Sequence, residues 1–469
     1  MSAPSDERTI TDLVVVLPGI LGSTLEKNGT PVWAPSVGAV AEAIRTFGRS
    51  IPRLQLPDGI GDEHPGDGVE AVALMPDIHV LPGIWTAHLG YDLLLDRLRS
   101  SFHFVEVPPD DPDRAANLIP FAYDWRLSNR YNGRRLKQVV EPALERWRAQ
   151  GGQFAGAKVT FIGHSMGGLV ARWFIEKEGG AEITRRLITL GTPYRGALRA
   201  LDQLVNGVQK GIGPFKLDLT QFARSMPSTY QLLPEYACIE SPGGLLKIGE
   251  TQVPELDTAM AADAMRFHDE LDEAAAAHPV DAYALHPFVG TRQRTVTTAR
   301  VAGGRVDLVD TIEGKDDGGD ATVPRLAAAP KGVDPDSNIL RWPADKHGSL
   351  QSNESLFAEL HGVLTARPVH YRGLKPNELR VDTEELLLAG EPLAIAVEAN
   401  DRLSIEASVT DEKGVEVARV PLPVTDGVAR TEIDLLTPGA HVVTVRGVGN
   451  AGARVAPVTS TVLVWEAAP

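Results

Sequence analysis

The chain has 469 residues, 43% of them hydrophobic and 23% charged, a composition typical of globular proteins and long enough for two or three domains. Its formal net charge of −16 argues against a nucleic-acid partner and against attraction to an anionic membrane surface. Cys238 is the only cysteine, which excludes an intramolecular disulfide and is compatible with a reducing compartment.

Neither a leader peptide nor a membrane span is predicted. The first residues lack the basic and then apolar profile of a secretory signal, and no run approaches the ~18 apolar residues of a membrane helix. We therefore expect a soluble, cytoplasmic protein with at most transient contact to a membrane surface.

From residue 13 to about residue 365, short apolar runs alternate with helical patterns. This alternation is typical of an α/β protein with a mostly parallel sheet and helices on both faces. A helix is predicted over Asp257–Ala277. The predicted strands are, in chain order, Leu13–Ile20, Asn117–Ala122, Lys158–Gly163, Arg186–Leu190, Arg305–Thr311 and Asn338–Trp342.

Beyond residue 366 the pattern changes to a period of two, interrupted by turn dipeptides. Short strands are predicted at Leu403–Ala407, Gly414–Val417 and His441–Arg446. About 100 residues of this kind are typical of a small antiparallel sandwich of immunoglobulin-like type. We therefore predict a first domain over residues 1–367 and a second domain, the sandwich, over residues 368–469.

A Gly-x-Ser-x-Gly sequence at residues 163–167 lies between a predicted strand and an amphipathic helix. In an α/β hydrolase such a turn presents a nucleophilic serine in a strained, exposed conformation. Gly163 and Gly167 remove side chains that would collide where strand and helix pass each other. Ser165 is therefore the candidate nucleophile, and an ordinary glycine-rich turn is the alternative.

A serine hydroxyl needs a base to take its proton and an acid to orient that base, in the chain order Ser, Asp or Glu, His. Asp320 follows the predicted strand Arg305–Thr311 and is the candidate acid. His347 follows the predicted last strand and is the candidate base.

Other residues compete for these two roles. Asp316 and Asp317 lie beside Asp320, so a solvated acidic turn is the alternative there. His361 and His370 are the competing histidines, and His164 is predicted to pack in the turn rather than act as a base.

Attack on an ester carbonyl places negative charge on its oxygen, which two backbone N–H groups must stabilise. One is predicted to be the N–H of Met166, directly after the nucleophile. The other is predicted to be that of Ile20, in the loop Leu17–Ser23. An ordinary Pro-Gly turn is the alternative for this loop.

Together these motifs resemble the lecithin:cholesterol acyltransferase-like α/β hydrolases, which include lysosomal phospholipase A2 and phospholipid:diacylglycerol acyltransferases. The resemblance implies an α/β-hydrolase fold with an inserted cap, Ser165, Asp320 and His347 as triad, and the N–H groups of Ile20 and Met166 as oxyanion hole. It stops before the C-terminal domain and implies no function for it. The segments that carry the resemblance are Leu17–Ser23, Tyr123–Arg126, Gly163–Gly168, Gly191–Gly196, Ser228–Pro234 and Gly319–Val323.

Extracellular relatives hold a flap near the substrate entrance with a disulfide, whereas the corresponding region here, residues 33–77, has no cysteine. Two apolar regions favour a lipid substrate. The segments Leu201–Val205 and Gly211–Phe215 are predicted to cover the nucleophile and line an acyl pocket, and Trp85 to lie at an entrance or a membrane surface. Internal packing is the alternative for both.

The sequence therefore predicts a serine esterase or lipase of phospholipase A type, with water or an alcohol as the acyl acceptor. The alternatives are an amidase or peptidase of the same fold, and a non-catalytic or gated partner-binding protein. The expected partners are a lipid or other acyl ester, and a protein at the C-terminal domain. No cofactor or metal is expected; Asp316, Asp317 and Asp320 could bind calcium, but a lone acidic loop is more often solvated.

Overall fold

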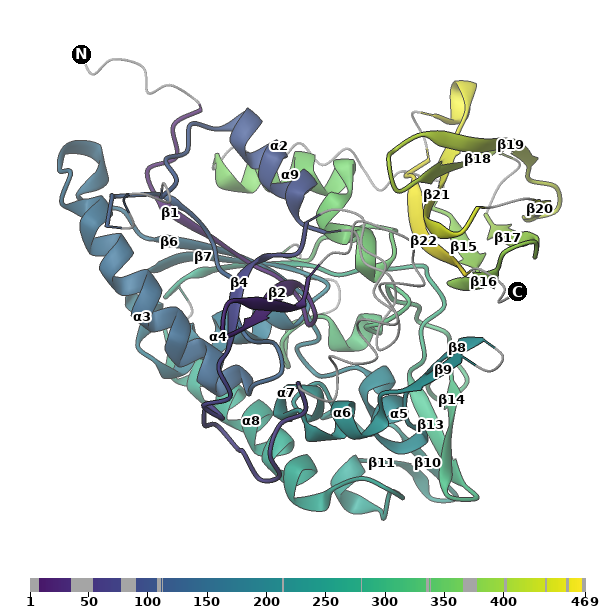
Figure 1. Cartoon of the computed structure of the whole chain (residues 1–469), viewed down its shortest axis with the longest axis horizontal. Helices are drawn as coiled ribbons and strands as arrows, with labels where there is room; N and C mark the ends of the chain where they lie inside the picture. The colour runs from purple at the N-terminus through teal and green to yellow at the C-terminus, as the bar shows by residue number, and fades with distance from the viewer. Residues whose placement is uncertain are drawn as a thin grey trace.

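The computed structural model describes residues 8–34, 54–76, 90–107, 111, 113–212, 215–279, 281–334, 337, 339–365, 378–399, 403–434, 437–452 and 455–465. The chain forms an α/β part followed by an all-β C-terminal part (Figure 1). Among the described residues, no helix is both long and apolar enough to cross a bilayer.

A five-stranded parallel sheet forms the centre of the α/β part, as the alternating pattern predicts. Its strand order is β12-β7-β6-β1-β5, and every neighbouring pair is parallel. All residues of β1 and β6 are buried, because helices cover both faces of the sheet. The strands are β1 (Leu13–Leu17), β5 (Leu118–Pro120), β6 (Val159–His164), β7 (Thr184–Leu190) and β12 (Ala284–Phe288).

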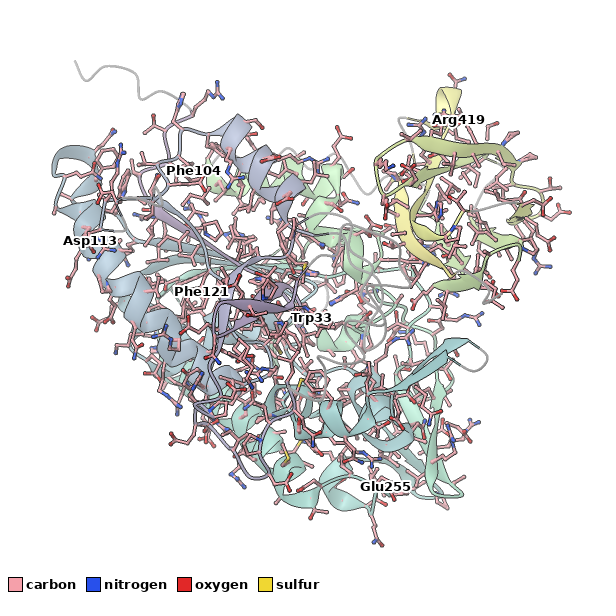
Figure 2. All side chains as sticks on the ribbon, viewed as in Figure 1. Trp33, Phe104, Asp113, Phe121, Glu255 and Arg419 are labelled. Carbon is pink, nitrogen blue, oxygen red and sulfur yellow. The ribbon has the colours of Figure 1, made fainter. Side chains whose placement is uncertain are left out.

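Helices lie on both faces of this sheet (Figure 1), and an apolar core lies on each face. Val15 and Leu17 of β1 belong to the larger core, with helices α3 (Asn129–Arg148), α4 (Met166–Lys177) and α8 (Thr258–Ala277). Val14 and Val16 belong to the other core, with α2 (Asp92–Ser101) and α9 (Glu354–Leu364). This division follows from the strand period of two. Trp33 and Phe121 lie in the interior, whereas Glu255 extends from the surface (Figure 2).

Two predicted strands differ in the structure. Arg305–Thr311, predicted as a late strand of the parallel sheet, is instead β14 (Arg305–Val309), which pairs antiparallel with β13 (Thr298–Ala302) in a separate sheet. The strand predicted at Asn338–Trp342 is reduced to a bridge between Arg341 and Phe288, and Asn338 lies outside the described residues. The edge strand next to β7 is β12, which the sequence did not predict. Its Leu-His-Pro-Phe sequence lacks a strand pattern because it contains Pro287.

Smaller elements surround the central sheet. The chain between β7 and β12 forms most of an inserted layer, and a three-stranded sheet follows β1. The remaining elements of this part are β2 (Ser23–Lys27), β3 (Thr30–Trp33), β4 (Val69–Leu74), α5 (Leu198–Asn206), β8 (Gln209–Ile212), β9 (Phe215–Asp218), α6 (Thr220–Ser225), α7 (Pro227–Tyr230), β10 (Ile239–Ser241), β11 (Gly244–Leu246), β13 (Thr298–Ala302), and short 3-10 helices at Gly152–Phe154, Gly180–Glu182, Ile248–Glu250, Arg325–Ala327 and His347–Ser352 (η6).

The C-terminal part consists of two sheets, with strand orders β15-β17-β20 and β16-β22-β21-β18-β19, that share one apolar core. It is strand-rich, as the alternating pattern predicts; its immunoglobulin-like type stays a prediction. The predicted domain boundary falls within residues 366–377, outside the described residues. The strands are β15 (Arg380–Thr383), β16 (Leu386–Leu388), β17 (Leu393–Glu398), β18 (Ser404–Asp411), β19 (Glu416–Pro423), β20 (Val428–Ile433), β21 (Gly439–Gly447) and β22 (Val458–Trp465).

The contact between α3 and α4 yields a stability prediction at Gly133. Alanine is normally more favourable than glycine inside a helix, by up to about 1 kcal/mol. A Cβ at Gly133, however, would lie 2.4 Å from Cδ1 of Trp173, whose ring is stacked on Phe267 of α8. We therefore expect Gly133→Ala to destabilise the protein by about 1–3 kcal/mol, measured by urea unfolding followed by tryptophan fluorescence.

Gly156→Ala is the control, because a Cβ there would meet no atom within 4 Å. Its unfolding midpoint should stay at or slightly above that of the wild type. A Gly133→Ala protein as stable as the wild type would mean that α3 and α4 pack less closely than described.

Candidate active site

Ser165 occupies a sharp turn between β6 and α4. It has φ 51° and ψ −126°, a backbone conformation that is strained for a residue with a side chain. A Cβ at Gly163 would lie 2.7 Å from the backbone of Gly168, and one at Gly167 would lie 2.3 Å from the carbonyl oxygen of Pro18. Only glycine fits at these two positions, which explains the Gly-x-Ser-x-Gly pattern in steric terms.

The predicted base contacts the predicted nucleophile. His347 is the first residue of η6, and its Nε2 lies 2.8 Å from Oγ of Ser165. The imidazole is 4% exposed, so few water molecules compete for this hydrogen bond. The structure therefore brings together two residues that are 182 positions apart in the sequence.

The predicted acid contacts the other ring nitrogen of the base. Oδ2 of Asp320 lies 2.7 Å from Nδ1 of His347, and Oδ1 accepts hydrogen bonds from the N–H groups of Thr322 and Val323. The backbone N–H of His347 also donates to the carbonyl oxygen of Asp320, over 2.7 Å. Gly191, with φ 61°, leaves room for the pair, since a Cβ there would approach Asp320 Oδ2 to 2.9 Å.

The acid loop reaches this position by a route other than the predicted one. It does not follow a strand of the central sheet, because β14 lies in a separate sheet. Instead, the backbone N–H of Gln293, in the chain after β12, donates to the carbonyl oxygen of Gly319 over 3.0 Å. This hydrogen bond to the loop after β12 thus places Asp320 at the carboxyl edge of the parallel sheet.

The competing acids have other contacts. Asp316 forms an ion pair with Arg380, and Asp317 forms one with Lys315. Within the described part of the chain, no cluster of three or more His, Cys, Asp and Glu side chains could hold a metal ion. Burial raises the pKa of Cys238 to about 12, which removes its thiolate as a competing nucleophile.

The competing histidines lie elsewhere. His361 on α9 stacks against Phe102, with ring centroids 4.7 Å apart, on the face of the sheet covered by α2 and α9. His370 lies outside the described residues.

The sequence predicted that His164 packs in the turn. In the structure its side chain also forms two hydrogen bonds. Its Nε2 lies 3.0 Å from the carbonyl oxygen of His347, which only accepts, so Nε2 carries the proton. Its Nδ1 lies 2.8 Å from the hydroxyl of Tyr91. The same hydroxyl accepts from the N–H of Gly19, over 2.7 Å, and its burial raises the pKa of Tyr91. These hydrogen bonds connect the Leu17–Ser23 loop to the backbone of the candidate base.

Tyr91 was missed by the sequence analysis. It is the residue before α2, and 73 positions separate it from His164. A tyrosine before a helix has no local feature that predicts such a contact.

The two predicted oxyanion donors lie in suitable backbone contexts, and their role stays a prediction. Met166 is the first residue of α4, where a backbone N–H has no partner within the helix. Ile20 lies in a tight turn closed by the hydrogen bond from the Gly22 N–H to the Gly19 carbonyl oxygen. Because Tyr91 accepts from Gly19, the next N–H in the loop, that of Ile20, is the candidate.

A narrow apolar pocket opens beside Ser165 and His347. Ile20, Leu21 and Met75 line it from the N-terminal loops. The inserted layer contributes Ala197 and Leu232, whereas Leu201 and Leu204, predicted to line an acyl pocket, are fully buried in the larger core. Trp85 lies outside the described residues.

The family model for lecithin:cholesterol acyltransferase matches residues 113–255. Phospholipase A(1) LCAT3 of Arabidopsis thaliana is 28% identical over 245 residues, which are 47% of this chain and 52% of that protein. Lysosomal phospholipase A and acyltransferase of Homo sapiens is 31% identical over 118 residues, which are 24% of this chain and 27% of that protein. The chain thus spans about half or less of the curated relatives it matches.

A lipase of Bacillus licheniformis, BlEst2 in its propeptide form, covers 98% of this chain and 94% of its own at 12% identity. Its TM-score is 0.31. The assignment of an α/β-hydrolase fold therefore rests on the parallel sheet, the strand-to-helix turn at Ser165 and the family match.

The hydrogen bond between Asp320 and His347 yields a prediction about the reactivity of Ser165. Asp320→Asn keeps the size of the side chain but favours the wrong tautomer of the imidazole, at a cost of about 10⁴-fold in a comparable triad. We expect covalent labelling of Ser165 by a fluorophosphonate to slow by orders of magnitude. Asp317→Asn, which changes a carboxylate three residues away, is the matched control and should label at the wild-type rate. Equal slowing in both variants would contradict the assignment.

The hydroxyl of Tyr91 yields a second prediction. Tyr91→Phe keeps the ring and leaves the N–H of Gly19 and the Nδ1 of His164 without this partner. Unsatisfied buried groups cost about 1–3 kcal/mol, so labelling of Ser165 should slow by about 10-fold or more as the loop shifts. Tyr283→Phe, at a half-buried tyrosine that donates to Glu176 outside the pocket, is the control. Labelling of Tyr91→Phe at the wild-type rate would show that the chain of hydrogen bonds does not affect the nucleophile.

Proposed function

We propose that this chain, which belongs to an LCAT-like family, is a serine hydrolase that cleaves the acyl esters of lipids through an acyl-enzyme on Ser165. The observation that carries the proposal is the buried series of hydrogen bonds from Asp320 through His347 to Ser165, beside an apolar pocket. The family relatives support acyl-ester hydrolysis or transfer in general. The serine mechanism and the phospholipase A type of this chain are part of our proposal.

The first half-reaction follows from the geometry. As Oγ of Ser165 attacks the ester carbonyl, its proton passes to Nε2 of His347, 2.8 Å away. Asp320 keeps the other ring nitrogen protonated and stabilises the imidazolium. The N–H groups of Ile20 and Met166 donate to the oxyanion. When the tetrahedral intermediate collapses, the C–O bond to the leaving alcohol breaks, and His347 returns the proton to that oxygen.

The second half-reaction repeats these steps with a new nucleophile. His347 removes a proton from water or an alcohol as that molecule attacks the acyl-enzyme, and Ser165 leaves with the proton from His347. Water yields a fatty acid, and an alcohol yields a new ester. Both outcomes use the same residues, so the acceptor is decided by what reaches the acyl-enzyme.

The pocket favours an acyl chain as the group bound beside the nucleophile. Its walls include Ile20, Leu21, Met75, Leu232 and Val323, which would remove an apolar chain from water. A cytoplasmic location, a protein partner of the C-terminal part and brief contact with a membrane surface stay predictions.

The proposal predicts that ester turnover depends on Ser165. We would measure acyl release from p-nitrophenyl esters of increasing chain length and from a phosphatidylcholine dispersion. Turnover by the wild type should favour long chains or phospholipid. Ser165→Ala should lower it by about 10⁴-fold or more, because the nucleophile is lost.

Ser404→Ala, which removes an exposed hydroxyl from the C-terminal part, is the control and should turn over normally. Circular dichroism should show that both variants are folded. Turnover of amides but not esters would favour a peptidase, and no turnover by folded wild-type protein would favour a gated or partner-binding role. Equal turnover by Ser165→Ala and the wild type would exclude the serine mechanism.

A further inference from the structure

The C-terminal part contacts the two loops that carry Asp320 and His347. On the base side, the N–H of Thr459, in β22, donates to Oδ1 of Asp345 over 2.9 Å. On the acid side, Gln293 hydrogen-bonds to the backbone on both sides of Arg380 in the C-terminal part. Both contacts lie behind the catalytic pair, away from the apolar pocket, since none of these residues lines it.

Asp345 is a buried carboxylate two residues before His347. It is 1% exposed, and burial raises its pKa while the surrounding hydrogen bonds oppose this effect. Oδ2 accepts from Nδ2 of Asn353 over 2.7 Å, and Oδ1 accepts from Ser349, from the N–H of Lys346 and from Thr459. A carboxylate with this many donors fixes the backbone on both sides of His347 relative to β22.

Gln293 has the corresponding position on the acid side. Its side chain is 1% exposed; Nε2 donates to the carbonyl oxygen of Leu379 over 3.0 Å, and Oε1 accepts from the N–H of Val381 over 3.1 Å. Its own backbone N–H donates to the carbonyl oxygen of Gly319, the residue before Asp320. One buried glutamine therefore connects the acid loop directly to the C-terminal chain.

Charged contacts surround this connection. Arg380 donates to Asp316 over 2.7 Å and to the carbonyl oxygen of Arg292 over 2.8 Å. Nζ of Lys346 lies 3.3 Å from Oγ1 of Thr383 in β15. Both loops of the catalytic pair thus contact the same small β structure.

We propose that the C-terminal part is a positioning element of the active site, with Asp345 and Gln293 as the positioning residues that set the distance between Asp320 and His347. This inference rests on the proposed function. Asp345 and Gln293 touch no reacting atom; they act through the loops of the acid and the base. The role follows from geometry, because catalytic groups must be held to within about 0.5 Å and a misplacement of about 1 Å can cost about 10²-fold in rate.

The first test removes the connections. Asp345→Ala and Gln293→Ala should each lower kcat for a soluble short-chain ester by about 10-fold to 100-fold. KM should stay near the wild-type value, because the pocket is unchanged. Val409→Ala is the control, since Val409 is fully buried in the C-terminal core and its truncation destabilises that part without touching either loop. It should lower thermal stability and leave kcat unchanged.

A rescue experiment separates positioning from a general loss of stability. In the double variant Asp345→Asn with Asn353→Asp, donor and acceptor exchange places between the two side chains. The new amide can still accept from Thr459, and an aspartate at position 353 can still accept from the N–H of Leu356 at the start of α9. The double variant should recover most of the kcat that Asp345→Ala loses, whereas Asp345→Asn alone should recover less.

A spectroscopic readout does not depend on turnover. The Nδ1 proton of His347, shared with Asp320 over 2.7 Å, should give a downfield proton resonance in the wild type that Asp320→Asn abolishes. This resonance should shift or broaden in Asp345→Ala and Gln293→Ala and persist in Val409→Ala. If one variant does not fold, the other and the exchanged pair still decide the matter.

The outcomes distinguish this inference from the proposed function. Folded wild type without Ser165-dependent turnover contradicts the function, and the resonance then tests positioning by itself. Active wild type with normal kcat and an unchanged resonance in both alanine variants overturns the inference. A loss of kcat in Val409→Ala equal to that in the other two variants would also overturn it, because stability alone would then explain the effect.

Discussion

The hydrogen bond of 2.7 Å between Asp320 and His347 is the interaction on which the rest of the site depends. It orients the imidazole so that Nε2 faces Ser165, and it requires two loops from different parts of the chain to meet at the carboxyl edge of one sheet. Gly191 leaves space for the pair, and the backbone N–H of His347 also donates to the carbonyl oxygen of Asp320. The surrounding packing preserves this geometry.

The base is restrained on two sides by different parts of the molecule. In the α/β part, His164 donates to the carbonyl oxygen of His347 and is itself oriented by Tyr91. Behind it, Asp345 accepts from β22 of the C-terminal part. The first restraint also includes the loop of Ile20, so the Leu17–Ser23 loop and the candidate base are part of one hydrogen-bonded network. The proposed positioning role makes the C-terminal part an extension of the candidate site.

Local patterns predicted well what local sterics determine. The turn at Ser165 was predictable because strand, glycines and helix are contiguous in the sequence, and β1, which pairs with β6, is a continuous apolar run. The strand at Arg305–Thr311 was assigned to the wrong sheet; its alternation of polar and apolar residues is typical of a half-exposed antiparallel strand, which β14 is. The strand β12 was missed because His286 and Pro287 interrupt its pattern.

The sequence by itself determined the strained serine, the α/β class, a strand-rich C-terminal part and, through motif order, the candidate acid and base. These features depend on residues close in the chain or on the order of motifs along it. Only the tertiary structure decided that Tyr91 orients His164, that the chain after β12 carries the acid loop, and that Asp345 and Gln293 contact the C-terminal part. Such contacts join positions tens to more than a hundred residues apart, and no periodicity or composition encodes which distant backbone groups a buried side chain will meet.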